Sequence, residues 1–300
     1  MSILLQAKNI SKSFGNKQAL KNVSFEISKG APVALVGPNG AGKTTLFSIL
    51  CGYLAPSSGQ VELFSRAPNH SSNLSRLGAL PQDAQLDPRF AINHQLKFYA
   101  QLQGLSRKNA QIEAERVLEL VQLSDVLNEK PLSLSHGMRK RVAIAQALIG
   151  SPELILLDEA TAGLDPLHAR EVRSLVANLA DETTFILSSH DLNELERLCE
   201  QVLFLENGVL QQHQTSNTEN STHCYTLRMA HEQPNIGGAL QSISADIKVT
   251  KISNKEYVIT APASGLNLSI DVEVLKLCHQ NNWHYKQLIN GKTLEDKLFS

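Results

Sequence analysis

The sequence predicts an α/β fold built on a mostly parallel sheet, followed by a small α+β domain. Short β-rich runs alternate with helical patterns through roughly the first two hundred residues, which is typical of parallel strands joined by crossover helices. Residues 154–157, and residues 184–187 apart from Thr184, are continuously apolar, as expected of strands that are buried on both faces of a sheet. A length of 300 residues is enough for one large domain or two ordinary ones.

Several elements of the first domain can be placed from the residue pattern. Strands are expected at three runs before the first helix, at residues 4–10, 23–27 and 32–36. A turn is expected at Gly15 and Asn16, and a helix should begin near Gly42. Helical periodicity is found at residues 92–104 and 109–122. In the second of these helices one stripe should be buried, made of Ile112, Val117, Leu118 and Val121.

A polar stretch divides the chain. Residues 213–222 have almost no apolar side chains, so we interpret them as a linker between a first domain, 1–212, and a second, 223–300. A long polar surface loop is the alternative. Beyond this stretch, strands and helices alternate in the order βαββαβ, at residues 224–229, 235–243, 245–252, 256–260, 268–279 and 284–289. This order predicts a small ferredoxin-like domain.

Composition argues against several classes of protein. A formal net charge of −1 is unlike that of a general nucleic-acid binder, which carries a basic excess. The four cysteines are scattered without a CxxC pair, so we expect reduced thiols rather than a zinc site or a disulfide framework. No run of about 18 apolar residues occurs and the N-terminus does not resemble a signal peptide, so the chain is not expected to cross a membrane.

The segment between the third expected strand and the first helix fits the P-loop pattern GxxxxGK[ST]. Glycines let successive N–H groups point at phosphate oxygens, and the following helix presents its positive N-terminal end to the same anion. Lys43 can reach the β- and γ-phosphates, and the Thr44 hydroxyl can bind Mg²⁺. A glycine-rich turn without a ligand is the alternative, but the strand and helix on either side favour a nucleotide site. The candidate ATP contacts of this segment are Gly37, Pro38, Asn39, Gly40, Ala41, Gly42, Lys43, Thr44 and Thr45.

Two acids follow the apolar run 154–157, and ligands of a parallel sheet lie beyond the carboxyl ends of its strands. We expect Asp158 to hold Mg²⁺, through water, and Glu159 to orient and polarise the attacking water. His190 follows the next buried strand and is a candidate sensor of the γ-phosphate. Each of these residues alone would usually be an ordinary residue at a strand end. Their combination with a P-loop favours catalysis.

Residues 134–141 read LSHGMRKR, stand about twenty residues before Asp158 and open a helix that is expected at residues 142–148. This segment resembles the signature of the ATPase subunits of ABC transporters, usually LSGGQ followed by basic residues. The resemblance implies a P-loop NTPase cassette with a mostly parallel sheet, an antiparallel β part and a helical insert at about 83–134. It also implies that two cassettes enclose two ATP molecules. Ser135 and the Gly137 N–H would then contact the γ-phosphate bound to the partner's Lys43.

Residues at three further positions match the pattern of the same family. Gln82 matches the Q-loop glutamine that approaches Mg²⁺ and the water. Asp165 matches the D-loop residue that faces the dimer interface, and Phe14 stands where an aromatic ring stacks on adenine. Six elements thus occur in the family's order over residues 3–210.

The sequence also departs from the family pattern at three positions. His136 replaces the usual first signature glycine, Met138 replaces glutamine, and Ala160 stands where proline is common. Ser135 and Gly137 remain, so the resemblance still implies a working shared site.

By this resemblance the chain is the ATP-binding and ATP-hydrolysing subunit of an ABC transporter. Its expected partners are a second copy and a separate transmembrane permease, with no nucleic acid, and its expected place is peripheral, at the cytoplasmic face of the plasma membrane. Residues 293–299 resemble the ending of a group of ATP-driven exporters, whereas a random amphipathic tail is the plainer interpretation.

Two other classes of protein also carry a P-loop. A soluble ABC-type ATPase of translation or DNA maintenance would normally carry two cassettes or a long coiled coil. A metabolic P-loop kinase would have no use for the segment 134–138.

Overall fold

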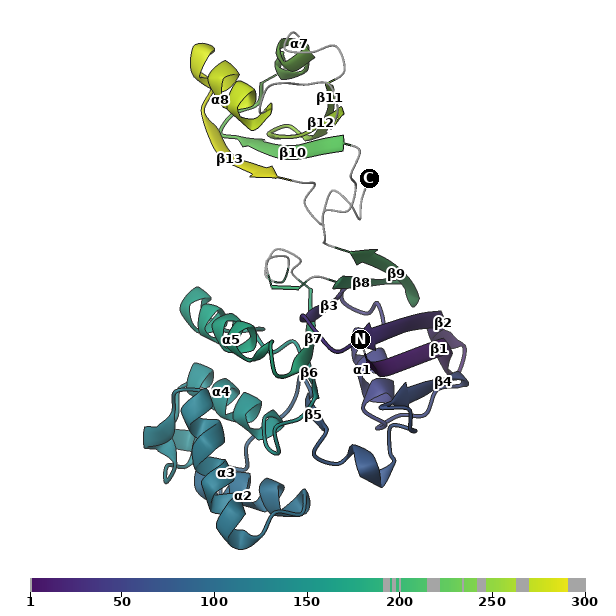
Figure 1. The fold of residues 1–300 in the computed structure, drawn as a ribbon, viewed down its shortest axis with the longest axis vertical. Coiled ribbons are helices and arrows are strands. Elements are labelled where there is room, and N and C mark those ends of the chain that lie inside the picture. The colour runs from purple at the N-terminus through teal and green to yellow at the C-terminus, as the bar shows by residue number, and fades with distance from the viewer. Residues whose placement is uncertain are drawn as a thin grey trace. The chain divides into compact units, whose positions relative to one another are not determined.

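The computed structural model describes residues 2–190, 195, 198–199, 201–214, 222–233, 235–241, 247–262 and 270–290. The chain divides into two compact units, Met1–Thr215 and Ser216–Ser300 (Figure 1). Among the described residues, no helix combines the length and the apolar character needed to cross a membrane.

The first unit begins with an antiparallel sheet in the order β2-β1-β4. It consists of β1 (Ile3–Phe14), β2 (Lys17–Ser28) and β4 (Ser58–Leu63). The expected turn at Gly15 joins β1 to β2, and both strands are longer than the apolar runs that predicted them. Alternate side chains such as Leu5 and Ala7 are buried, whereas Lys8 and Asn9 are exposed, so one face of the sheet lies on the core.

A second sheet has six strands in the order β5-β6-β7-β3-β8-β9. Its members are β5 (Leu77–Leu80), β6 (Leu154–Asp158), β7 (Thr184–Ser189), β3 (Val33–Val36), β8 (Gln201–Glu206) and β9 (Val209–Gln214). All neighbours are parallel except β8 and β9. Every residue of β3, β6 and β7 is buried, as their apolar runs predicted.

Helix α1 (Lys43–Leu50) and both sheets share one hydrophobic core, in which Leu5, Leu46 and Leu156 are fully buried. The core therefore fixes the start of α1 against the carboxyl end of β3, where the P-loop lies.

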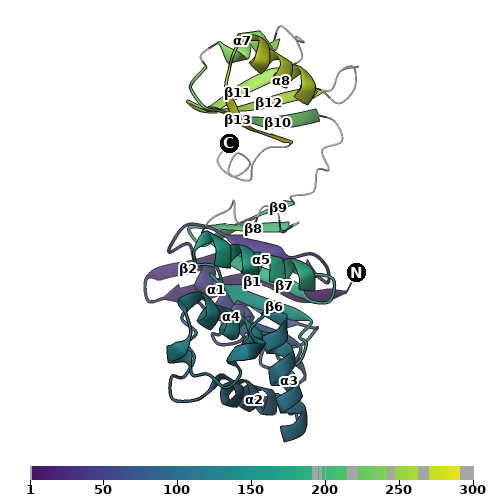
Figure 2. The ribbon, with the colours of Figure 1, turned by 90° about the vertical axis from the view of Figure 1, so that its left-hand side faces the viewer.

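The helical part consists of α2 (Ile92–Leu102), α3 (Arg107–Leu120) and α4 (His136–Ala147), and α5 (Pro166–Leu179) follows β6. Helices α2 and α3 pack side by side, apart from the sheets (Figures 1 and 2). One prediction was wrong in detail: Ile112 is 56 % exposed, whereas Val117 and Leu118 are fully buried. Five residues of helix turn the chain by about 140° between Ile112 and Val117, so the two cannot share one face.

Two boundaries differ from the sequence predictions for physical reasons. Helix α4 begins at His136 and not at Val142, because the Ser135 side chain accepts a hydrogen bond from the Met138 N–H and caps the helix. Strand β9 continues to Gln214, into the stretch interpreted as a linker. It is an edge strand, so backbone pairing with β8 is enough to extend it without apolar side chains. Residues 215–221 lie outside the described part.

The second unit has an antiparallel sheet in the order β11-β12-β10-β13. Its elements along the chain are β10 (Thr222–Met229), α7 (Ile236–Gln241), β11 (Lys248–Ser253), β12 (Glu256–Pro262), α8 (Ile270–Gln280) and β13 (Tyr285–Asn290). Its core joins both helices to one sheet face through Leu227, Leu240 and Val274. The βαββαβ order and this strand arrangement are those of a ferredoxin-like unit. Residues 242–246, and the tail at 293–299, lie outside the described part.

Candidate functional site

Residues 37–42 connect β3 to α1 and fold too tightly for larger side chains at two glycines. A Cβ on Gly37 would lie 2.0 Å from the Leu205 carbonyl oxygen. Gly42, with φ of 110°, precedes α1, and a Cβ there would lie 2.7 Å from the Ala19 carbonyl oxygen. Backbone packing therefore requires glycine at both positions.

The side chain of Lys43 lies inside this loop. Its Nζ donates to the carbonyl oxygens of Gly37, at 2.7 Å, and Pro38, at 3.2 Å. Burial lowers the pKa of Lys43, and the nearby carboxylates of Glu159 and Asp158 oppose that shift. Both acids therefore place negative charge near the Lys43 ammonium group.

Asp158 ends β6 and is only 1 % exposed. Its Oδ1 accepts a hydrogen bond from the Ser188 hydroxyl, and its Oδ2 has no hydrogen-bond partner among the described residues. Burial raises the pKa of Asp158, while the hydroxyls of Ser188 and Thr44 act to lower it. An unpaired, buried carboxylate oxygen beside a hydroxyl is a donor set that suits Mg²⁺, which prefers one or two protein oxygens together with phosphate oxygens and water.

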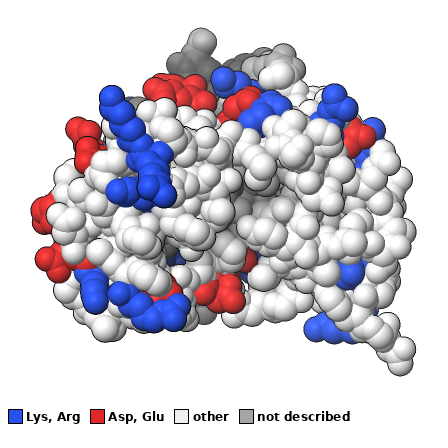
Figure 3. All heavy atoms as spheres, turned by 90° about the horizontal axis from the view of Figure 1, so that it is seen from below, with Lys and Arg blue, Asp and Glu red and all other residues white. Residues whose placement is uncertain are grey.

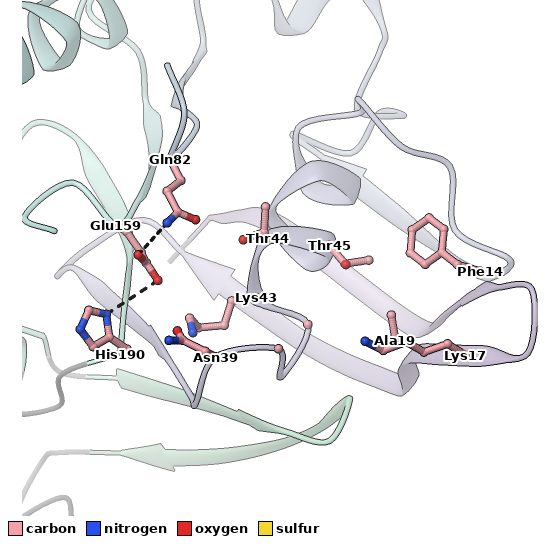
Figure 4. A pocket seen from close by; sticks show the side chains of 12 residues that line it. Phe14, Lys17, Ala19, Asn39, Lys43, Thr44, Thr45, Gln82, Glu159 and His190 are labelled. Carbon is pink, nitrogen blue, oxygen red and sulfur yellow. Dashed lines mark hydrogen bonds and ion pairs between the residues drawn. The ribbon is translucent and has the colours of Figure 1, made fainter. Parts of the chain in front are cut away.

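Glu159 directly follows Asp158 but adopts a left-handed backbone with φ of 48°. Its N–H donates to the Ser188 Oγ at 2.9 Å. Its carboxylate accepts a hydrogen bond from Gln82 Nε2 at 3.0 Å, and its Oε1 lies 3.8 Å from His190 Nδ1 (Figure 4). Glu159, Gln82 and His190 thus meet at one point, near the fourth predicted catalytic residue, Lys43 (Figure 4).

A pocket of about 540 Å³ opens over these groups. Its lining residues are Phe14, Lys17, Ala19, Asn39, Gly40, Gly42, Lys43, Thr44, Thr45, Gln82, Glu159 and His190. Figure 4 shows Phe14 and Lys17 at the end opposite Glu159 and His190, with Lys43, Thr44 and Thr45 between them. An elongated ligand with an aromatic ring at one end and negative charge at the other fits this order of side chains.

The predicted trans contacts lie outside this pocket. Ser135 is exposed and caps α4, and Gly137 is buried in the first turn of that helix. Asp165 caps α5, where its Oδ1 accepts hydrogen bonds from the N–H groups of Leu167, at 3.0 Å, and His168, at 3.2 Å. These residues therefore do not take part in the site of their own chain.

Comparison with known proteins shows the family. The ABC transporter family matches residues 20–162. The ABC transporter ATP-binding protein YxlF of Bacillus subtilis is 34 % identical over 229 residues, which cover 75 % of this chain and 76 % of YxlF. This chain belongs to the ABC transporter ATP-binding proteins.

Other comparisons agree with this assignment. The Nod factor export ATP-binding protein I of Rhizobium etli is 35 % identical over 204 residues, covering 67 % of the present ATP-binding protein and 64 % of that relative's length. A solved ATP-binding cassette, a dimer in a post-hydrolysis state bound to ADP and Pi, is 26 % identical with a TM-score of 0.65; the match covers 71 % of this chain and all of that cassette. The predicted α/β cassette fold is therefore confirmed, and the family is one of ATPases.

Three residues of the cassette's site were missed by the sequence reasoning. Lys17 and Ala19 line the pocket from β2, and nothing in their local sequence marks them. Ser188 holds both Asp158 and the Glu159 backbone. A signal for it existed, since Ser188 is the penultimate residue of β7, the strand that neighbours β6, and stands two residues before His190.

Proposed function

We propose that this chain binds ATP and Mg²⁺ in the pocket of Figure 4 and hydrolyses the ATP, as the motor subunit of an ABC exporter. The observation that carries the proposal is that Lys43 and Glu159 line one pocket at the carboxyl end of β6, where the buried Asp158 precedes Glu159. A P-loop lysine opposite a pair of acids is an arrangement suited to phosphoryl transfer to water.

Each side chain has a role that follows from its position. The loop N–H groups and Lys43 hold the β- and γ-phosphates, and Phe14 stacks on the base. Glu159, held by Gln82 and His190, orients the attacking water and accepts its proton. Such catalysis is mostly positioning and electrostatic stabilisation.

Mg²⁺ would be held by Thr44 and Asp158, with Gln82 nearby. When bound, it neutralises charge that develops on the phosphate oxygens.

The active form in this proposal is a homodimer. Ser135 is exposed at the N-terminus of α4, so a second copy's γ-phosphate can meet that helix end, the Gly137 N–H and the loop at Asp165. The dimeric cassette bound to ADP and Pi supports this arrangement.

The proposed membrane partner is a separate permease, with this chain peripheral on the cytoplasmic side. Exposed apolar side chains gather at and around α2: Phe90, Phe98 and Leu102. At this end of the first unit the surface is broadly uncharged, and Lys, Arg, Asp and Glu lie mostly toward its edge (Figure 3). Such a surface suits protein contact. Export as the direction rests on the name of the Rhizobium etli relative.

The substitution Glu159→Gln tests the proposal. It should keep ATP binding, stabilise an ATP-dependent dimer and lower the hydrolysis rate at least about a hundredfold, because a positioned base contributes that much. Glu119→Gln, at an exposed position on α3, is the matched control and should leave the rate unchanged. Normal hydrolysis by Glu159→Gln would refute the assignment of the base. ATP-independent co-purification with ribosomes or DNA, in place of a membrane protein, would refute the transport role.

A further inference from the structure

Two histidines at the starts of α4 and α5 each lie against a glycine of the other segment. The ring of His168, in α5, has carbon atoms 2.9 Å from the position that a Cβ on Gly137 would take. In return, His136 Nε2 lies 3.7 Å from the corresponding position on Gly163. Neither histidine lines the nucleotide pocket. The two contacts join the signature segment, residues 134–138, to the loop 159–165.

His168 makes a second contact, with Asp165. Its Nδ1 forms a hydrogen bond with Asp165 Oδ2, while Asp165 Oδ1 accepts the N–H groups of Leu167 and His168. Both carboxylate oxygens of Asp165 are thus held. The His168 side chain is only 29 % exposed, so its ring is fixed between Asp165 and Gly137.

The contact with Gly137 leaves little freedom for movement. At 2.9 Å, an added methyl group would overlap the ring, so ring and helix are already at van der Waals contact. A shift of α4 relative to the loop 159–165 would have to break the ring packing or the bond to Asp165. The same loop carries Glu159 at its other end, in the chain's own pocket.

We propose that His168 is a positioning residue that fixes the signature segment to the loop 159–165, so that Ser135, Gly137 and Asp165 meet the partner's nucleotide as one rigid unit. His136 supports this unit through Gly163. The inference rests on the proposed dimer, and it adds a residue that acts on ATP bound by the partner without touching the ATP bound by its own chain.

The test uses the full chain in the Glu159→Gln background, with dimerisation measured by sedimentation at saturating ATP. His168→Ala removes the ring packing and the bond to Asp165. Loss of these two contacts should weaken the binding between the two copies about two- to tenfold at each shared ATP site. A homodimer has two such sites, so the dimer Kd should rise about four- to a hundredfold. ATP affinity of the monomer should stay unchanged, because His168 lies outside that pocket.

Two conservative variants separate the contacts. His168→Asn keeps a donor near the Nδ1 position, and His168→Phe keeps a flat ring over Gly137; both dimer Kd values should lie between those of the parent and His168→Ala. Gly137→Ala should weaken the dimer less in the His168→Ala background than alone, because the ring that it overlaps is gone. His279→Asn, at an exposed position on α8, is the control.

The outcomes are distinct. If Glu159→Gln itself forms no ATP-dependent dimer, the proposed function fails and this inference with it. If that variant dimerises and His168→Ala dimerises equally well, the positioning role alone is wrong. An equal loss of monomer ATP affinity and dimer affinity in His168→Ala would also overturn it, since a general structural defect would explain both.

Discussion

Removal of one hydroxyl should disturb both acids of the site. Ser188 Oγ donates to Asp158 Oδ1 and accepts the Glu159 N–H at 2.9 Å, and Ser188 is buried. Ser188→Ala deletes both hydrogen bonds and introduces no new group. It leaves a buried carboxylate oxygen and a backbone N–H without their partner.

The cost can be worked out from these two bonds. A hydrogen bond to a charged group contributes about 1.5–3 kcal/mol, and a neutral one about 1 kcal/mol. We therefore expect Ser188→Ala to lower the free energy of unfolding of the first unit by about 2–4 kcal/mol. The lost donor also lets the pKa of Asp158 rise further above its usual value, because the Ser188 hydroxyl acts to lower it. More of the carboxyl is then protonated as pH falls, so the acid limb of ATPase activity should move to higher pH and more Mg²⁺ should be needed.

Urea unfolding followed by circular dichroism measures the stability change. The one tryptophan, Trp283, lies in the second unit, so its fluorescence reports that unit separately and should not shift. Thr183→Val is the matched control, because the Thr183 hydroxyl is also buried but donates to a neutral acceptor, the Pro152 carbonyl oxygen. It should cost about 1 kcal/mol and leave the pH and Mg²⁺ dependence unchanged. The reasoning is refuted if Ser188→Ala behaves no differently from Thr183→Val.

Three further outcomes are expected. Burial, and to a smaller extent the Asp158 charge, raises the pKa of Cys51 to about 12. This thiol should therefore resist alkylation at pH 8 in the folded chain and react after unfolding. Rapid labelling of the folded protein would contradict this expectation. Hydrogen bonds from Arg89 lower the pKa of Asp87 to about 2, so Asp87 should remain ionised at pH 3, and in Arg89→Ala an NMR titration should show its pKa returning toward 3.8. A Cβ on Gly78 would lie 2.1 Å from a backbone oxygen of α4. Gly78→Ala should therefore lower the unfolding free energy by about 1–3 kcal/mol. Gly238 has open space around it, so Gly238→Ala should not be destabilising.

Much of the fold could be predicted because its signals are local. The fully buried strands β6 and β7 have continuous apolar runs, and the P-loop carries its own pattern of residue types. Strands β4 and β5 were not predicted, because Gly59 and Gly78 interrupt short runs and only pairing with β1 and β6 makes them strands. In the same way, a polar edge strand such as β9 is formed by its neighbour rather than by its own side chains.

The site residues also differ in whether a local sequence pattern marks them. Residues in contiguous motifs, such as Lys43 and Asp158, could be found from spacing. Ser188 acts through hydrogen bonds to another strand, and His168 acts by packing on a glycine about thirty residues earlier in the chain. Contacts of this kind depend on how strands and helices are placed in space, and no local pattern encodes them.

The left-handed backbone of Glu159 has an evolutionary consequence. A non-glycine residue in this conformation costs of order 1 kcal/mol, and glycine would relieve that strain. Selection for stability alone would therefore favour Glu159→Gly, which lacks a carboxylate. Copies of this gene that no longer need this carboxylate are expected to lose it early, and such drift would leave a more stable first unit.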